Sequence, residues 1–339
     1  MISHVTGGGQ LPPEKTSFTA NQQSPRWAVI LAGGDGTRLR PLTRVIAGDE
    51  RPKQFCAVLG DDTLLGQTRS RVALAVKPSQ TFFALTQDHE RFYNSLLADV
   101  PRERLVIQPK NAGTAPAVLY SLLRLSKVAP SSTVAFFPSD HYFSDDRGFM
   151  SYVETAFEAA RTRDETVILL GVKPGGPEGE YGWIEPILPG LMENPDALCG
   201  VRRFWEKPSA EFAGTLMERG CLWNSFVMVG TVSAFLGMIR RASPELFDRF
   251  RRVELKLNTA DEAEAIAGLY SQIYDVNFSH EVLAASPADL AVLPVGGLKW
   301  SDLGKPQRVL STMVELGMPR AAERLWKSAA ASKGTTPGT

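Results

Sequence analysis

The amino-acid sequence predicts an α/β fold in which helices cover both faces of a mostly parallel, mixed sheet. Along the first half of the chain, short apolar runs of strand length alternate with longer segments whose apolar residues recur at helical spacing. Strands that are separated by helices of this length pair in parallel through right-handed crossovers, and the crossovers place the helices on both faces. A second observation is a glycine-rich loop directly after the first apolar run, at the edge where such sheets bind ligands.

The individual elements follow from these patterns. In the first half, the expected strands are 28–32, 81–86, 105–108, 133–137 and 166–171, and the expected helices are 63–76, 88–98, 114–127 and 149–162. In the less regular second half, the expected strands are 181–187, 201–205, 222–229 and 290–295, and the expected helices are 210–219, 232–241, 244–256 and 259–270. We interpret the second half as a continuation of the same sheet. One domain is therefore expected over residues 26–326.

The composition excludes several classes of partner. Lys and Arg together number 37, as do Asp and Glu, so no net positive field attracts nucleic acid or an anionic membrane. Three widely spaced cysteines without a C-x-x-C pair argue against a disulfide framework and a structural zinc site. Residues 1–25 lack the features of a signal peptide, and no apolar stretch reaches the length of about 18 residues that a membrane span needs. We therefore predict a cytoplasmic protein, with polar, disordered tails at 1–25 and 327–339.

The stretch WAVILAGGDGTRLRP at residues 27–41 predicts a phosphate-binding loop. Glycines allow positive φ angles and let backbone N–H groups approach a polyanion, while Arg38 and Arg40 add fixed positive charge. The loop lacks the Lys-Ser/Thr of a Walker A motif, and Leu39 stands where a dinucleotide fingerprint requires its third glycine. A generic glycine turn is the alternative, but the second basic segment at Arg51 and Lys53 favours a triphosphate.

Two carboxylates follow predicted strands and are candidate ligands of Mg²⁺. Asp140 follows the strand at 133–137, and Asp302 lies in the segment KWSDLG far down the chain. Mg²⁺ prefers oxygen ligands and usually takes one or two carboxylates together with substrate phosphates. A helix N-cap or an Asx turn is the alternative role for Asp140. If the two carboxylates meet in space, a metal site follows.

The segment after the strand at 201–205 carries a candidate site for a sugar phosphate. Lys207 has the charge to neutralise a phosphate, and Glu206 can accept hydrogen bonds from hydroxyl groups. An exposed Glu-Lys pair before a turn proline is the commoner explanation for these two residues alone. The segments GEYGWIE at 179–185 and WNS at 223–225 add aromatic and polar groups that suit the face of a hexose.

Taken in order, these motifs resemble those of the sugar-nucleotide pyrophosphorylases, most closely the bacterial mannose-1-phosphate guanylyltransferases. The motifs are LAGGDGTRLRP, RPKQF, NAGTAPAV, FFPSDH, GEYGWIE, FWEKP, LWNSF and KWSDLG, and they cover residues 26 to about 310. The resemblance implies a Rossmann-like, GT-A-like nucleotidyltransferase domain with a nucleotide-binding half at about 26–165 and a sugar-phosphate-binding half at about 166–326. We expect this domain without the added C-terminal isomerase or β-helix domain of longer relatives.

The resemblance assigns a role to each matching residue. Leu31, Gly33, Gly34, Gly36, Thr37 and Arg38 would contact the nucleotide, with Lys53 beside them, and Asn111, Thr114, Ala115 and Pro116 would border the guanine pocket. Gly182, Glu206, Lys207 and Asn224 would bind the sugar phosphate, and Asp140 and Asp302 would ligate Mg²⁺. Arg38 and Lys53 would be catalytic. Three positions depart from the mannose branch: Arg40 replaces its usual tryptophan, Phe226 its usual glycine and Ser279 its frequent acidic residue.

The expected reaction is therefore the formation of a nucleoside-diphosphate sugar and pyrophosphate from a nucleoside triphosphate and a sugar 1-phosphate, with GTP and mannose 1-phosphate as the expected pair. Two alternatives stay open. The first is a pyrophosphorylase that uses UTP or dTTP with another sugar 1-phosphate. The second is a catalytically silent homologue that binds a sugar nucleotide and regulates a partner. The sequence leaves the oligomeric state open, with a homodimer as one option.

Overall fold

A mixed sheet is the central element of the computed structural model, which describes residues 24–187 and 198–331. Within the described residues the sheet has nine strands: β1 (Arg26–Leu31), β2 (Thr81–Thr86), β3 (Leu105–Gln108), β4 (Thr133–Pro138), β6 (Val167–Val172), β7 (Gly182–Pro186), β8 (Cys199–Glu206), β9 (Leu222–Thr231) and β10 (Leu290–Val295). Their order is β3-β2-β1-β4-β9-β6-β10-β8-β7. The sheet therefore runs through both halves of the chain.

The strand pairings differ between the two halves. In the first half, β1 pairs in parallel with β2 and β4, and β2 pairs in parallel with β3. The long strand β9 lies between β4 and β6 and is antiparallel to both. Beyond it, β10 is parallel to β6, whereas β8 is antiparallel to β10 and β7. The predicted α/β class with a mixed sheet is confirmed, with its antiparallel pairings formed by β7, β8 and β9.

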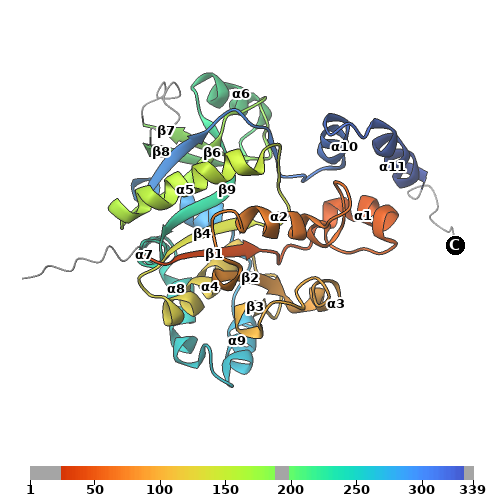
Figure 1. The fold of residues 1–339 in the computed structure, drawn as a ribbon. Helices are drawn as coiled ribbons and strands as arrows, with labels where there is room; N and C mark the ends of the chain where they lie inside the picture. Colours follow the sequence, from red (N-terminus) through yellow and green to blue (C-terminus); the bar gives the residue numbers. More distant parts are fainter. Residues whose placement is uncertain (1–23, 188–197, 332–339) are drawn as a thin grey trace, which may run out of the picture.

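Helices cover both faces of this sheet (Figure 1). The helices of the described residues are α1 (Arg40–Ala47), α2 (Leu64–Val72), α3 (Glu90–Tyr93), α4 (Thr114–Val128), α5 (Asp146–Thr162), α6 (Ala210–Glu218), α7 (Val232–Ala242), α8 (Pro244–Val253), α9 (Glu262–Tyr270), α10 (Pro306–Glu315) and α11 (Pro319–Ala331). The helices α2 and α5 pack on one face, and α4, α7, α8 and α9 pack on the other. In the described part of the chain, we find no helix with the length and apolar content needed to cross a bilayer.

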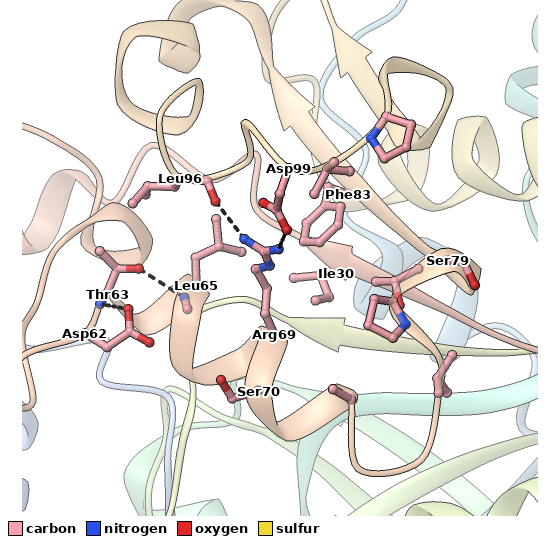
Figure 2. A pocket seen from close by; sticks show the side chains of 17 residues that line it. Ile30, Asp62, Thr63, Leu65, Arg69, Ser70, Ser79, Phe83, Leu96 and Asp99 are labelled. Atoms are coloured by element: carbon pink, nitrogen blue, oxygen red, sulfur yellow. Dashed lines mark hydrogen bonds and ion pairs between the residues drawn. The ribbon is translucent and has the colours of Figure 1, made fainter.

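The second predicted helix, at 88–98, is shorter than expected. Regular α-helix covers only Glu90–Tyr93, and turns follow it. The carbonyl oxygen of Leu96 accepts a hydrogen bond from the guanidinium of Arg69 at 2.7 Å (Figure 2), while the N–H of Val100 donates to the carbonyl of Leu97. In a longer helix, the carbonyl of Leu96 would accept a hydrogen bond from the N–H of Val100. The hydrogen bond from Arg69 to the same carbonyl competes with that helical hydrogen bond.

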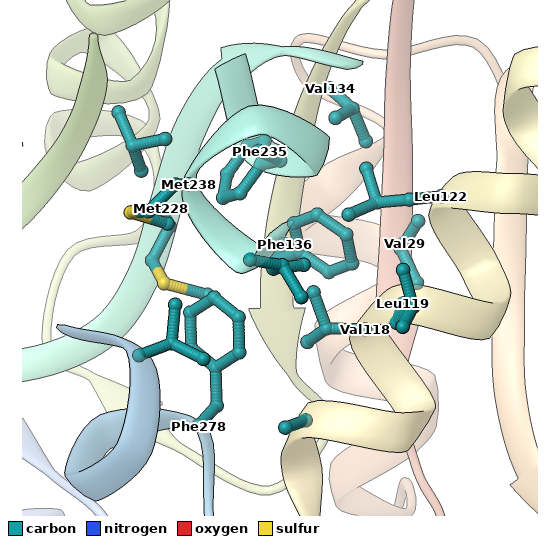
Figure 3. Close-up of a cluster of buried hydrophobic side chains, with 14 of the residues drawn as sticks. Val29, Val118, Leu119, Leu122, Val134, Phe136, Met228, Phe235, Met238 and Phe278 are labelled. Carbon is teal, nitrogen blue, oxygen red and sulfur yellow. The ribbon is translucent and has the colours of Figure 1, made fainter. Parts of the chain in front are cut away.

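Both faces of the sheet are buried, which explains why the strands are continuous apolar runs rather than alternating ones. Ala28, Val29 and Ile30 of β1 are fully buried. Val29 points into the core beneath α4 and α7, where it lies with Phe136 of β4 (Figure 3), whereas Ala28 and Ile30 point into the core beneath α2 and α5. Neighbouring residues of one strand therefore stabilise opposite layers.

The helices α10 and α11 pack against α1, beside the sheet rather than on it (Figure 1). Leu42 of α1, Met313 of α10 and Leu325 of α11 share one apolar cluster. The predicted disorder from residue 327 onward is wrong for residues 327–331, because α11 continues to Ala331. Alanine has the highest helix propensity, so this segment forms a helix although it is poor in large apolar residues. Residues 332–339 and 1–23 lie outside the described residues.

A two-stranded antiparallel ribbon joins the two halves of the chain at the carboxyl ends of the parallel strands. It consists of β5 (Tyr142–Phe143) and β11 (Trp300–Ser301). Asp140 precedes β5 and Asp302 follows β11. Because Ser301 pairs with Tyr142, this ribbon brings the two candidate metal ligands to the same edge of the sheet.

Candidate active site

The glycine loop and the basic segment after α1 form one unit. Gly36 has a φ of +57°, a left-handed conformation that glycine adopts without steric cost. A Cβ atom on Gly36 would lie 3.1 Å from the backbone nitrogen of Lys53, so the two segments are in direct contact. The side-chain amide of Gln54 donates a hydrogen bond to the carbonyl of Gly34 at 2.7 Å. Gln54 is buried and fixes the loop in place, a role that the sequence did not reveal.

The side chain of Arg38, the cationic residue of the loop, is accessible. Gly33 sits close to β2, because a Cβ atom there would lie 2.9 Å from the hydroxyl oxygen of Thr86. A short 3₁₀ turn at Thr37–Leu39 follows and carries Arg38, whose side chain is 61% exposed. The Arg38 guanidinium thus reaches solvent beside a glycine-rich loop of the kind that binds anions.

Lys53 connects both candidate metal ligands. Its ammonium nitrogen lies 3.4 Å from a carboxylate oxygen of Asp140 and donates a hydrogen bond to the backbone carbonyl of Asp302. The Lys53 side chain is 10% exposed, so the surrounding residues hold its charge in this place. The structure therefore brings together three residues that the sequence places up to 249 positions apart.

The carboxylate of Asp302 is held in its ionised form. Its Oδ1 accepts hydrogen bonds from the backbone N–H of Gly304 at 2.8 Å, from Arg308 at 2.7 Å and from the hydroxyl of Tyr181 at 3.3 Å. Burial raises the pKa of Asp302, but the positive charge of Lys53 and the other partners outweigh it, and the pKa is lowered overall.

The donor set at this position fits Mg²⁺. Within residues 24–187 and 198–331, we find no group of three or more His, Cys, Asp or Glu side chains that would enclose a metal ion by itself. Asp140 and Asp302 instead offer one carboxylate each, and Lys53 joins them by contacting the Asp140 carboxylate and the backbone carbonyl of Asp302. Two carboxylates that rely on substrate phosphates for the remaining ligands are typical of Mg²⁺ rather than of zinc or calcium sites.

The four candidates for sugar-phosphate binding also lie together. Gly182 of β7 pairs with Glu206 of β8 across the sheet. A Cβ atom on Gly182 would lie 3.1 Å from a carboxylate oxygen of Glu206 and 3.3 Å from the Cβ of Asn224, so glycine permits their close approach. The ammonium of Lys207 lies 3.0 Å from the Glu206 carboxylate, and its side chain is half exposed. This arrangement leaves a cation next to two hydrogen-bonding side chains.

An irregularity in β9 positions Asn224. The register between β6 and β9 shifts after this residue, and the Asn224 side-chain oxygen accepts a hydrogen bond from the backbone N–H of Phe226 at 3.0 Å. Phe226 has a φ of +59°, which lies in the left-handed region. This backbone conformation gives a physical reason for the glycine that the mannose branch usually has at this position.

The candidates around the expected base pocket are only partly accessible. The side-chain amide of Asn111 donates a hydrogen bond to the carboxylate of Asp35 in the glycine loop at 2.9 Å. The hydroxyl of Thr114 accepts a hydrogen bond from the backbone N–H of Phe278 at 2.8 Å. Ala115 and Pro116 are buried in the first turn of α4. Asn111 is therefore exposed and Thr114 partly exposed, whereas Ala115 and Pro116 belong to the buried side of the same segment.

Asp35, within the glycine loop, and His89, beside it, are two residues to which the sequence assigned no role. An imidazole nitrogen of His89 lies 3.3 Å from the carboxylate of Asp35, which also receives the amide of Asn111. Burial lowers the pKa of His89. No partner of His89 was predictable from the sequence, because the contact joins the loop to a 3₁₀ turn 54 positions further along the chain.

A second set of charged residues that the sequence missed lies between the two halves. The carboxylate of Glu180 contacts Lys305 at 2.8 Å, Arg38 at 3.2 Å and Arg308 at 3.7 Å. The hydrogen bond from Lys305 is the main cause that lowers the pKa of Glu180. Arg308 is also bound to Glu178 and Asp302, both at 2.7 Å. Ion pairs thus connect the glycine loop to the candidate metal ligand Asp302.

A cavity of about 600 Å³ between α2 and the turns at 96–101 is separate from this site (Figure 2). Its lining is mainly apolar, with Arg69 crossing it to Asp99 at 2.6 Å. Among the described residues, none of the candidate site residues lines this cavity.

Comparisons with known proteins identify the family of this chain. The family model described as Nucleotidyl transferase matches residues 27–317. The chain is 28% identical over 280 residues to the alginate biosynthesis protein AlgA of Pseudomonas syringae pv. tomato, covering 81% of this chain and 56% of that protein. It is 27% identical over 293 residues to mannose-1-phosphate guanylyltransferase of Escherichia coli K12, covering 83% of this chain and 58% of that enzyme. The chain thus spans little more than half the length of these relatives.

Solved structures show the same fold. A mannose-1-phosphate geranyltransferase from Thermus thermophilus is similar with a TM-score of 0.70 and 29% identity, covering 84% of this chain and 79% of that one. A mannose-6-phosphate isomerase from Helicobacter pylori has a TM-score of 0.64 at 19% identity, covering 82% of this chain and 99% of that one, and shows the fold alone. Because the family model matches far more than half of the chain, the predicted resemblance is confirmed and this protein belongs to the nucleotidyl transferase family.

Proposed function

We propose that this protein transfers a nucleotidyl group from a nucleoside triphosphate to a sugar 1-phosphate, which yields a nucleoside-diphosphate sugar and pyrophosphate. GTP and mannose 1-phosphate are the substrates we propose. Family membership supports the reaction class, and the names of the relatives from Escherichia coli and Thermus thermophilus support the mannose substrate.

The observation that carries this proposal is the position of Lys53. Its backbone nitrogen lies beside Gly36 of the glycine loop, while its ammonium contacts the carboxylate of Asp140 and the backbone carbonyl of Asp302. A triphosphate held by the loop would therefore have a fixed cation and two hard oxygen ligands next to its phosphates. Such an arrangement suits phosphoryl chemistry, in which positioning and charge neutralisation provide most of the catalysis.

The proposed reaction is an in-line displacement. A phosphate oxygen of the sugar 1-phosphate attacks the α-phosphorus, and the bond between this phosphorus and the oxygen bridging to the β-phosphate breaks. The electron pair of that bond leaves with the pyrophosphate. Arg38 and Lys53 stabilise the charge that develops on the leaving group, and Lys207 orients the attacking phosphate. The protein forms no covalent intermediate in this scheme.

Asp140 and Asp302 are the residues that would hold Mg²⁺, which would neutralise phosphate charge when it is bound. The network around Asp302 keeps its carboxylate ionised and therefore ready to act as a ligand. The contact with Lys53 keeps both acidic residues close together before any substrate arrives.

A pyrophosphate-release assay tests this function. Purified full-length protein is incubated with GTP and mannose 1-phosphate, with and without Mg²⁺, and the Arg38→Ala variant serves as a control for contaminating activity. We expect release that depends on both substrates. A panel that combines UTP or dTTP with glucose 1-phosphate determines the specificity, because a better rate with one of those pairs would replace our proposed substrates.

The same assay separates catalysis from regulation. A regulatory homologue would bind GDP-mannose in a direct binding measurement yet release no pyrophosphate with any substrate pair. That result would contradict the proposed reaction. The presence of Arg38, Lys53, Asp140, Lys207 and Asp302 in one region favours catalysis over this alternative.

A further inference from the structure

Glu180 lies where the positive charges of the two halves converge. One of its carboxylate oxygens is 2.8 Å from the ammonium of Lys305, and the other is 3.2 Å from Arg38 and 3.7 Å from Arg308. These three cations come from the glycine loop, from the residue that precedes α10 and from the first turn of α10. A single carboxylate thus receives three cations from two segments, the glycine loop and the start of α10.

The three cations differ in how firmly they are held. Arg308 is 13% exposed and has Glu178 and Asp302 as further partners, so it stays in place without Glu180. For Arg38 and Lys305, Glu180 is the acidic partner that we find among the described residues. Removing the Glu180 carboxylate from this position would leave both of these cations available to another anion.

Solvent exposure makes this contact exchangeable. The side chains of Arg38, Lys305 and Glu180 are 61%, 38% and 37% exposed. Ion pairs of this kind contribute little to the stability of a fold and are weakened by salt. A ligand with more negative charge than one carboxylate therefore competes well for the same cations.

We propose that Glu180 is an internal anion that occupies a polyphosphate site formed by Arg38 and Lys305 and that leaves it when a polyphosphate binds. The proposal rests on the proposed function, in which Arg38 binds the phosphates of the nucleotide. It adds Lys305 as a phosphate-binding residue and assigns the ligand class as pyrophosphate or the triphosphate tail of a nucleotide. Glu180 weakens the binding of either ligand and so favours the release of the pyrophosphate product.

Direct binding of inorganic pyrophosphate tests this proposal. Isothermal titration calorimetry is performed on the full chain without nucleotide or sugar. We expect Glu180→Gln to bind pyrophosphate about 3–10-fold more tightly than the unmodified protein, because competition for Arg38 and Lys305 is lost. Lys305→Gln should bind it about 10-fold more weakly, since one cation is removed from the site. In a variant that carries both substitutions, Glu180→Gln should increase the affinity for pyrophosphate by a smaller factor.

A matched control separates local competition from net charge. Glu185 lies five residues away, where its carboxylate accepts a hydrogen bond from Trp205 at 3.3 Å. Glu185→Gln removes the same charge and should leave the affinity for pyrophosphate within about two-fold, because screening weakens charges at a distance. Equal gains in Glu180→Gln and Glu185→Gln would show a general charge effect and overturn the proposal.

Other outcomes are equally decisive. An unchanged or weaker affinity in Glu180→Gln would show that Glu180 supports the site instead of competing for it. An unchanged affinity in Lys305→Gln would remove Lys305 from the site. Because binding is measured without turnover, a failed activity assay would contradict the proposed function and leave this test intact. Normal turnover with no effect of Glu180→Gln on pyrophosphate binding would contradict only the inference.

Discussion

The ammonium of Lys53 lies 3.4 Å from a carboxylate oxygen of Asp140, at the carboxyl edge of the central parallel strands. This ion pair joins the segment after the glycine loop to the residue after β4. The same ammonium also donates a hydrogen bond to the backbone carbonyl of Asp302, so Lys53 connects the two candidate metal ligands.

Replacing Lys53 with the uncharged Met should reduce activity strongly. The variant keeps the length of the side chain but loses the cation that would neutralise the leaving pyrophosphate. We expect kcat to fall by about 10²-fold or more, a loss typical for one electrostatic contact to a transition state. Steady-state pyrophosphate release is the measurement. Lys127→Met, an exposed residue of α4, is the control, and similar losses in both variants would contradict the proposed role.

Arg38→Ala should lower kcat without lowering stability. The Arg38 side chain is 61% exposed and its ion pair with Glu180 is solvated, so its removal should change the free energy of unfolding by less than about 1 kcal/mol. We expect a loss of about 10²–10³-fold in kcat, because the stabilisation that Arg38 offers increases in the transition state. As a control, Arg44→Ala removes a similarly exposed arginine from α1. Near-normal turnover in Arg38→Ala would exclude Arg38 from the mechanism.

Two glycine substitutions distinguish a phosphate loop from a simple turn. Gly36→Ala forces alanine into a φ of +57° and places its Cβ 3.1 Å from the Lys53 nitrogen. We expect it to lower the free energy of unfolding by about 1–3 kcal/mol in chemical denaturation. Gly34→Ala places a Cβ with no described atom within 4 Å. Its stability should change by less than about 0.5 kcal/mol, while the KM for the nucleotide rises because the methyl group obstructs the phosphates. An unchanged KM in Gly34→Ala would favour a simple turn.

Activity should require Mg²⁺ through Asp140 and Asp302. A chelator should abolish pyrophosphate release, and added Mg²⁺ should restore it. Asp140→Asn and Asp302→Asn should each raise the Mg²⁺ concentration that gives half-maximal activity by about 10-fold or more, since each removes a charged ligand. The exposed residue Asp164 gives a control in Asp164→Asn. Unchanged Mg²⁺ dependence in both site variants would place the metal elsewhere.

The left-handed backbone at Phe226 predicts an unusual order of stabilities. Phe226→Ala and Phe226→Gly both remove the ring that packs edge-on against Phe278, with ring centroids 6.2 Å apart. They differ in the cost of a φ of +59°, which glycine avoids. We expect Phe226→Gly to be more stable than Phe226→Ala by about 1 kcal/mol in denaturant unfolding. The opposite order, which is normal within a strand, would show that no strain is stored at this position.

The sequence by itself determined the features that depend on neighbouring residues. The apolar run at 28–32 predicts the strand that the structure has at 26–31, and the glycines after it predict a loop with a positive φ, found at Gly36, because strand burial and positive φ impose local requirements on residue type. The motifs were equally local, so their family could be predicted before any contact was known. The low apolar content from residue 327 onward led to a wrong prediction of disorder for the end of α11. Its small residues form a helix that α1 and α10 stabilise by packing.

Only the tertiary structure decided which of these motifs meet. The β5–β11 ribbon brings Asp140 and Asp302 to the same edge of the sheet, where Lys53 contacts both residues. Arg38 and Glu180 are 142 positions apart, and their ion pair depends on the packing of both halves. No local pattern encodes such a contact, because charged residues at a surface have many potential partners. The fold determines which of these partners come within contact distance. The resulting ion pairs connect the loop that is proposed to hold the nucleotide to the half that is proposed to hold the sugar.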